Sequence, residues 1–313
     1  MARRHTGRPG SSARKDRMTP DRLWAVLKET FAGWLNDNVP RMGAALAYYT
    51  LFALAPILVV VIAVGGMAFG PEAVRGEIVA QIQGLVGRDG AQAIQAILEG
   101  AAKSSWSIPA TIIGVITFFL GATGAFLELQ DDLDAIWRVK PRSRGNFLRD
   151  LLMQRIISFG LVLGFAFLLL TSLVVSAALA AVHSYIGSAV PGVAALWAAG
   201  YAVVSLGVIT LLFAMIYKVL PDVKLKWADV WVGALVTAVL FTVGKFLIGL
   251  YLGTSSFVST YGAAGSVIVV LVWVYYSSQI ILLGAEFTRA YVERFGPRPP
   301  PVKFATKDPD PTK

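Results

Sequence analysis

The amino-acid sequence predicts an all-α polytopic membrane protein with six transmembrane helices. Residues 44–69, 156–182 and 246–285 contain no Asp, Glu, Lys, Arg or His, and roughly 20 apolar residues are enough for a helix to cross a bilayer. Hydrophobic residues make up 56% of the 313-residue chain and charged residues 15%, whereas about a quarter of a soluble domain is charged. The chain therefore belongs in a membrane rather than in water.

The N-terminal region precedes the first apolar stretch. Residues 1–18 are basic, rich in Gly and Ser and without apolar periodicity, which predicts a disordered tail. Residues 19–38 predict an amphipathic helix, with Thr19 at the N-cap and Pro20 in the first turn. This helix either lies on the cytoplasmic membrane surface or packs against the cytoplasmic end of the bundle. Its apolar face comprises Leu23, Trp24, Leu27, Phe31, Trp34 and Leu35.

Six apolar stretches predict the spans of a transmembrane domain over residues 39–292. Pro56, in the middle of the first span, predicts a kink. Between the first and second spans, residues 71–86 and 89–102 form two short amphipathic segments that we expect on the outer membrane surface. Residues 293–313 form a Pro-rich cytoplasmic tail. The predicted spans are residues 41–69, 108–128, 151–182, 190–220, 227–250 and 261–287.

Basic residues fall on alternate connections between these spans and produce the net charge of +9. The links at residues 183–189 and 251–260 contain no Lys or Arg. The connections after the second and fourth spans are basic, which places them and both termini in the cytoplasm. Anionic headgroups of membrane lipids are the expected partners, and no nucleic acid is expected. The cytoplasmic cations are Arg138, Lys140, Arg142, Arg144 and Arg149 in one connection and Lys218, Lys224 and Lys226 in the other.

Four stretches resemble a known family. They read RMGAALAYYTLFALAPILVVVI in the first span, FLELQDDLDAIWRV after the second, LPDVKLKWADVWVGALVTAVLF into the fifth and YGAAGSVIVVLVWVYYSSQIILLGAEFTRAYVERFG through the sixth. In this order they resemble the YihY/BrkB family of bacterial inner-membrane proteins, once labelled ribonuclease BN. The resemblance implies a six-helix fold in the bacterial inner membrane and no defined activity. Asp134 departs from the family pattern, in which we expect Asn.

Signatures of an enzyme are nearly absent. The chain has no Cys and only two His, His5 and His183, so neither a histidine-based metal site nor a catalytic triad can be assembled. We therefore expect no catalytic residues, no metal and no cofactor. The remaining candidate ligands, for magnesium in a ribonuclease, are acidic residues after the second span. We interpret them instead as a solvated acidic helix end that faces the following cations. They are Glu128, Asp131, Asp132 and Asp134.

Ionisable residues inside the spans are the candidate binding residues, because such groups normally face protein or water. Glu128 ends the second span on a face of small residues. Glu286 ends the sixth span in phase with Gln279 and Tyr275, which predicts a polar face over about three turns. Structural ion pairs at the helix ends are the alternative to a role in binding an ion or a substrate. The available basic partners are Arg41, Arg155 and Arg289.

Lys245 is a further candidate, near the outer end of the fifth span. Helical side chains lean toward the N-terminus, which works against its reaching the outer surface. It shares a face with Ala234, Ala238, Thr242 and Gly249, so we expect it to project into the bundle toward an anionic headgroup or a carboxylate. Snorkelling to the outer surface is the alternative.

These features favour a transporter or flippase-like protein for an amphipathic or lipid-like solute. The alternative is a structural or assembly protein whose buried polar residues only hold the bundle together, and a membrane-bound ribonuclease is not favoured. Three GxxxG spacings indicate close helix packing and leave open a homo-oligomer. They are Gly66 with Gly70, Gly160 with Gly164, and Gly249 with Gly253.

Overall fold

The structure is a computed structural model that describes ten stretches of the chain. These are residues 20–70, 72–76, 78–79, 83, 95, 124–141, 193–254, 263–296, 299–301 and 305–307. The predicted tail at 1–18, the third span at 151–182 and most of the second span lie outside them. Helices dominate the described part, as predicted. They are α1 (Pro20–Asn36), α2 (Val39–Phe69), α6 (Val193–Val219), α7 (Trp227–Thr254), α9 (Ala263–Phe295) and an unlabelled helical segment at residues 124–136.

The helix bounds agree closely with several predicted spans. The first span, predicted over residues 41–69, is α2, and the fourth and fifth correspond to α6 and α7. α9 continues to Phe295, eight residues beyond the predicted end of the sixth span at 287. Within the described residues, three stretches are long and apolar enough to cross a membrane. They are Ala202–Val219, Trp227–Leu252 and Val267–Phe295.

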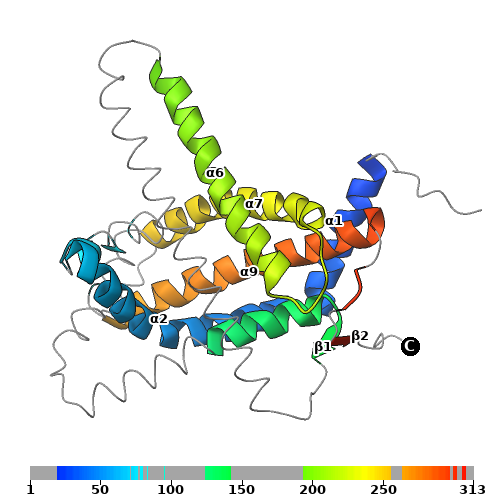
Figure 1. The fold of residues 1–313 in the computed structure, drawn as a ribbon, viewed down its shortest axis with the longest axis horizontal. Helices are drawn as coiled ribbons and strands as arrows, with labels where there is room; N and C mark the ends of the chain where they lie inside the picture. Colours follow the sequence, from blue (N-terminus) through cyan, green and yellow to red (C-terminus); the bar gives the residue numbers. More distant parts are fainter. Residues whose placement is uncertain are drawn as a thin grey trace, which may run out of the picture.

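α9 is the central helix of the described bundle. It lies between α2 and α7, and α6 crosses α7 at an inclination and extends away from the bundle (Figure 1). Residues 124–136 run beside the first half of α2, where a Cβ on Gly124 would stand 2.9 Å from the Tyr49 ring. α1 crosses the C-terminal end of α9 at a steep angle to the other helices (Figure 1).

Local sequence explains where the helices begin and end. Asn38 adopts the left-handed conformation with φ 55°, which turns the chain between α1 and α2, and a proline follows in the first turn of α2. Asn tolerates this conformation better than most residues do. α2 ends at Gly70, whose φ of 85° suits glycine. α7 begins where the Asp229 side chain accepts a 3.0 Å hydrogen bond from the Lys226 N–H, in the manner of a capping box.

Small residues bring α6, α7 and α9 into close contact. A Cβ on Gly284 of α9 would collide with Thr237 of α7 and with the Tyr217 hydroxyl of α6. Tyr217 is buried, and its O–H donates a 2.7 Å hydrogen bond to the Ile281 carbonyl. The GxxxG spacing at Gly249 is not used in this way, since a Cβ there would meet no atom within 4 Å. Close packing therefore occurs at glycines outside the predicted spacings.

A short sheet is the main departure from the predicted all-α class. Strands β1 (Val139–Pro141) and β2 (Ala305–Lys307) pair antiparallel, with Lys140 opposite Thr306. Upstream in the same tail, Val223 forms a bridge with Pro301, and the Lys224 N–H donates a 3.0 Å hydrogen bond to the Pro300 carbonyl. The C-terminal tail thus crosses both basic connections. Apolar periodicity could not predict this, because each strand is only three residues long.

Candidate functional site

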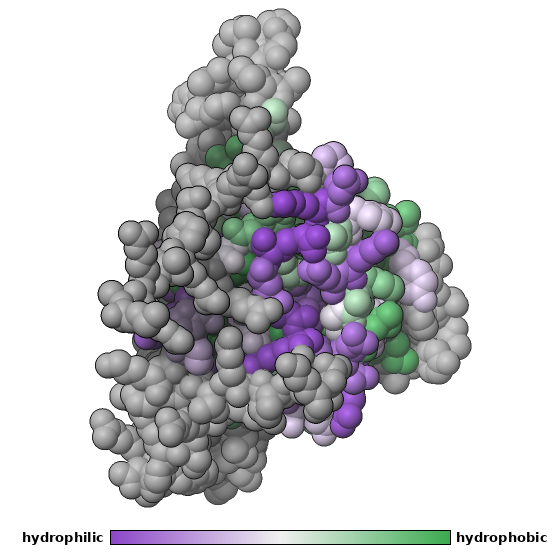
Figure 2. Space-filling view, turned by 90° about the vertical axis from the view of Figure 1, so that its right-hand side faces the viewer, coloured by the Kyte–Doolittle hydropathy of each residue, from purple (hydrophilic) through white to green (hydrophobic). Residues whose placement is uncertain are grey.

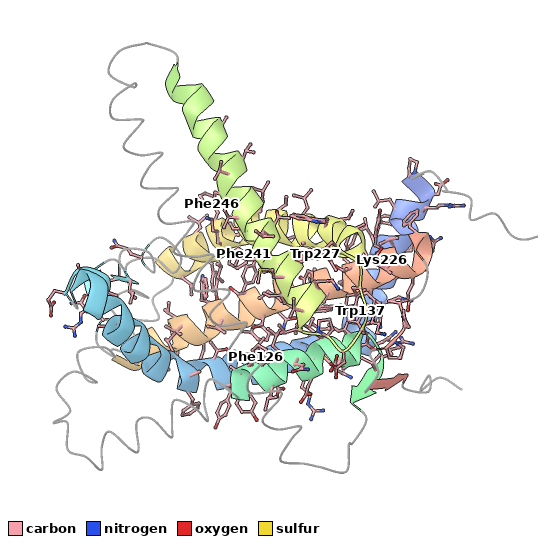
Figure 3. All side chains as sticks on the ribbon, in the orientation of Figure 1. Phe126, Trp137, Lys226, Trp227, Phe241 and Phe246 are labelled. Carbon is pink, nitrogen blue, oxygen red and sulfur yellow. The ribbon has the colours of Figure 1, made fainter. Side chains whose placement is uncertain are left out.

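One end of the bundle gathers the polar groups, and we call it the polar end. It comprises α1, residues 136–141 and 220–226, and the C-terminal part of α9. Seen from this end, hydrophilic residues occupy the middle of the surface, with apolar residues beside them (Figure 2). Lys226 and Trp137 lie at this end, whereas Phe246 lies far along α7 from it (Figure 3). The polar end corresponds to the side that the sequence predicts to be cytoplasmic.

Arg289 of α9 is the centre of a buried ion cluster at the polar end. Its Nη2 lies 2.7 Å from Glu286 Oε2, and its Nη1 lies 3.1 Å from Asp37 Oδ2. Nη1 also donates a 2.7 Å hydrogen bond to the Ile136 carbonyl. Glu286 is fully buried and Arg289 is 7% exposed. We call these four groups the Arg289 cluster, and it ties α9 to the turn after α1 and to the end of helix 124–136.

Glu286 and Arg289, two of the predicted site residues, are in contact in the structure. Asp37 was not among the predicted residues, and nothing in its local pattern indicates that it would contact residue 289. The Glu286 contact has the distance of an ion pair without the angle of a hydrogen bond, and in the described part of the chain no donor reaches its Oε1. A buried carboxylate with spare hydrogen-bonding capacity is unusual and is a candidate for a functional group.

Gln279 links α9 to Trp34 of α1 and to Val39 at the start of α2. The Trp34 indole N–H donates a 3.1 Å hydrogen bond to Gln279 Oε1, and Gln279 Nε2 donates a 3.3 Å bond to the Val39 carbonyl. Gly43 of α2 faces the Gln279 amide, and a Cβ there would collide with it. Because its amide bonds to both Trp34 and Val39, Gln279 links α9 to α1 and to the start of α2.

The acidic helix end after the second span is not solvated, contrary to our interpretation of the sequence. Asp132 and Asp134 are 5% and 3% exposed, and only Asp131 is exposed. Asp134 Oδ1 accepts a 2.6 Å hydrogen bond from the Asp222 N–H, so it ties helix 124–136 to the connection after α6. The sequence could not reveal this, because the two residues are 88 positions apart.

Burial changes the charge of these acids. It raises the pKa of Asp134 from 3.8 to about 7, with the bond from Asp222 N–H acting in the opposite direction and the carboxylates of Asp222 and Asp131 adding to the increase. It also raises the pKa of Asp132 to about 7, reinforced by Glu128 and Asp131. Among the described residues, no three His, Cys, Asp or Glu side chains converge as they would around a metal ion. Burial therefore lets Asp132 and Asp134 hold a proton at a higher pH than exposed Asp side chains do.

The other predicted site residues are not brought together. Glu128 is half-buried, and Tyr275 is 37% exposed. Arg41 is exposed at the beginning of α2, and Arg155 lies outside the described residues. Lys245 is half-buried, about 27 Å along α7 from Trp227 at 1.5 Å per residue. No described carboxylate contacts it, so its role in the bundle stays a prediction.

An apolar hollow lies where α6 separates from α7. Its volume is about 400 Å³, within the range of small-molecule sites. Its one hydroxyl, on Thr210, donates to the Leu206 carbonyl of its own helix at 2.7 Å. The other polar side-chain group in the walls is the Trp231 indole N–H, so the lining is mainly apolar. Sequence reasoning missed this site, which depends on the angle between two helices. The lining residues are Val203, Leu206, Gly207, Thr210, Trp231, Val232 and Leu235.

The helices are long enough to cross a membrane, pack closely at glycines and are linked at one end by buried ion pairs. These features define a polytopic α-helical membrane protein. The chain belongs to the BrkB family, since the family described as "Virulence factor BrkB" matches residues 30–308. This confirms the resemblance seen in the sequence.

Curated relatives carry the same kind of name. A UPF0761 membrane protein of Psychrobacter sp. (strain PRwf-1) is 29% identical over 272 residues, covering 86% of this chain and 48% of the relative. A UPF0761 membrane protein of Azotobacter vinelandii is 30% identical over 268 residues, covering 84% of this chain and 62% of the relative. The chain thus spans about half to three-fifths of the length of these relatives. No solved structure matches it.

Proposed function

We propose that the protein is a transporter of the flippase type, which moves an amphipathic, lipid-like solute across the bacterial inner membrane with both termini in the cytoplasm. The observation that carries this proposal is the apolar hollow between α6 and α7. It lies within two helices of membrane-crossing length, and its walls suit an acyl chain because they consist mainly of apolar side chains.

Charged groups lie at the end of α7 nearest the hollow. Trp231 lines the hollow one turn after Trp227, and Lys226 precedes that residue at the start of α7. Lys224 and Lys226 are both exposed. A solute with its chain in the hollow would therefore bring an anionic headgroup toward these cations. This arrangement favours an amphipathic solute over a purely apolar one.

A structural or assembly role is the second candidate. Within the Arg289 cluster, Arg289 contacts Glu286 and the Ile136 carbonyl. Gln279 bonds to Trp34 and to the Val39 carbonyl, so that the two groups of contacts hold α1, α2 and α9 together. Buried polar groups of this kind can serve only to fix how helices pack. An enzymatic function is not proposed.

Two glycines of α6 provide a matched test. A Cβ on Gly207, which lines the hollow, or on Gly200, which does not, would meet no atom within 4 Å. Gly207→Leu should therefore fill the hollow without disturbing helix packing, and Gly200→Leu is its control. We expect only Gly207→Leu to slow the inward movement of a fluorescent phosphatidylglycerol in proteoliposomes, measured by dithionite reduction. The assay is run with and without ATP and a proton gradient. If the lipid moves equally fast in protein-free and protein-containing vesicles under all of these conditions, the result would contradict transport and favour the structural role.

A further inference from the structure

α1 presents two different faces to its surroundings. The face packed on α9 consists of small or polar residues: Val26, Thr30 and Gly33 are buried there. The large apolar residues point elsewhere and remain between 44% and 60% exposed. We call them the α1 outer face, and they are Leu23, Trp24, Leu27, Phe31 and Leu35.

This division resolves the two alternatives left open by the sequence. The helix packs against the end of the bundle, but it does so with the face that the apolar pattern did not indicate. Trp34 belongs to the predicted apolar face but is half-buried, and its indole N–H bonds to Gln279. At 100° per residue the five members of the outer face cover about a third of the helix circumference. A continuous exposed apolar surface of this kind indicates an interaction site.

The direction of α1 and its flanking charge identify the partner. α1 crosses the ends of α2, α7 and α9 steeply (Figure 1), so it runs along the membrane plane if those helices cross the bilayer. Lys28, at the edge of the outer face, holds its Nζ 5.6 Å from the centre of the Trp24 ring. Trp, Phe and Leu on one face with Lys at its border are typical of helices that lie in the headgroup region of a bilayer.

We propose that the α1 outer face is inserted into the cytoplasmic leaflet at the boundary between headgroups and acyl chains, with Lys28 at the phosphates of anionic lipids. A second copy of the chain fits this surface poorly. The outer face is about 18 Å long and about 10 Å wide from helix dimensions. It therefore offers about 180 Å² per copy, far below the roughly 800 Å² per partner of a stable interface.

Spin labels on the full chain test this proposal, because the natural chain has no Cys. Phe31→Cys reports the outer face, and Ala32→Cys, also exposed but about 100° around the helix and outside that face, is the neighbouring control. Both positions are exposed, although Phe31→Cys removes the stacking of the Phe31 ring on Trp34, whose centroids lie 5.7 Å apart. The protein is reconstituted in nanodiscs of phosphatidylethanolamine and phosphatidylglycerol, and each label's collision rates with oxygen and with a water-soluble nickel chelate are measured.

We expect the label at 31 to favour oxygen and the label at 32 to favour nickel, each by several-fold. In nanodiscs of phosphatidylcholine alone, the label at 31 should lie at a shallower depth in the bilayer. The Lys28→Gln substitution should have the same effect. Nickel access at both positions would place α1 in water and overturn the proposal. Spin–spin broadening at 31, without access to either reagent, would also overturn it by showing contact between two copies.

Discussion

Gly33 of α1 lies directly against the Glu286 carboxylate of α9, so that a Cβ at residue 33 would stand 2.5 Å from Glu286 Oε2 and 2.8 Å from Arg289 Nη2. Both side chains are held in the Arg289 cluster, so neither can move aside without losing an ion pair. The absence of a side chain at residue 33 is therefore what allows α1 to pack on α9.

Gly33→Ala should destabilise the protein. Overpacking a buried site costs about 1–3 kcal/mol, and alanine recovers only about 1 kcal/mol of helix propensity. The net loss should be about 1 kcal/mol, measured as a lower unfolding temperature in detergent. Gly200→Ala is the control, because its Cβ meets open space, and this variant should unfold at an unchanged or higher temperature. A Gly33→Ala protein as stable as that control would mean that the contact is loose.

Removing the base of the Arg289 cluster should do more damage than neutralising its acid. In Arg289→Met, Glu286 stays fully buried without its cation, and Asp37 and the Ile136 carbonyl lose their partner. Breaking a buried pair in this way costs about 3–5 kcal/mol. In Glu286→Gln, Arg289 keeps both other partners, so the loss should be smaller.

The double variant separates charge from packing. Adding Glu286→Gln to Arg289→Met removes the uncompensated carboxylate and should recover part of the lost unfolding temperature. If the loss of stability in the double variant equals the sum of the losses in the two single variants, the two side chains do not interact, because contacting residues give non-additive effects.

Asp134→Asn should stabilise the protein at high pH. Burial raises the folded-state pKa of Asp134 to about 7, above its ordinary 3.8, so the folded protein holds a proton between these values that the unfolded chain releases. Stability from this group is thus complete below about pH 4 and is lost as pH rises through 7. Asn cannot titrate, and its side-chain oxygen can still accept the Asp222 N–H bond.

The gain at pH 8 should be on the order of 1 kcal/mol or more, and at pH 5 it should be smaller. Unfolding temperatures of the variant and the natural protein at the two pH values provide the measurement. A gain of equal size at both would exclude titration of Asp134 as its source. Asn is also the residue that we expect at this position from the family pattern, so the fold should accept it.

The C-terminal tail should be fixed to the connection after the second span. In Lys140→Cys with Thr306→Cys, the paired residues of β1 and β2 should form a disulfide under mild oxidation. The Cβ atoms of directly opposite cross-strand residues lie about 4.5–5.5 Å apart. In Lys140→Cys with Ala305→Cys, the second thiol is displaced by one residue from the paired register, in which Ala305 is opposite Pro141. Mass spectrometry of the linked peptides should detect only the first pair. Equal yields would mean that the tail has no fixed register.

The sequence predicted what depends on local apolarity and failed where a contact joins distant residues. The length of each apolar run predicted the ends of α2, α6 and α7 to within four residues. α9 continues beyond the predicted end of the sixth span to Phe295. In this extension Arg289 and Arg294 pair with Asp37, in the turn after α1, and with Glu29 of α1, more than 250 positions away.

The candidate site divides in the same way. Glu286, Gln279 and Arg289 were found because ionisable or polar residues within an apolar span are conspicuous. Asp37, the burial of Asp134 and the hollow beside Gly207 were not found. Each depends on how two helices cross, which the sequence of neither helix contains.

The orientation of the bundle should be the one that the basic connections predict. Gly76 follows α2 at the end opposite the polar end, is exposed, and has open space at its Cβ. Lys224 is exposed at the polar end. In intact spheroplasts an impermeant maleimide should label Gly76→Cys, whereas Lys224→Cys should react only after permeabilisation. The natural chain, which has no Cys, provides the blank. Labelling of Lys224→Cys alone from outside would reverse the orientation. Labelling of both would mean that an even number of spans separates the two residues, instead of the three in the six-span arrangement.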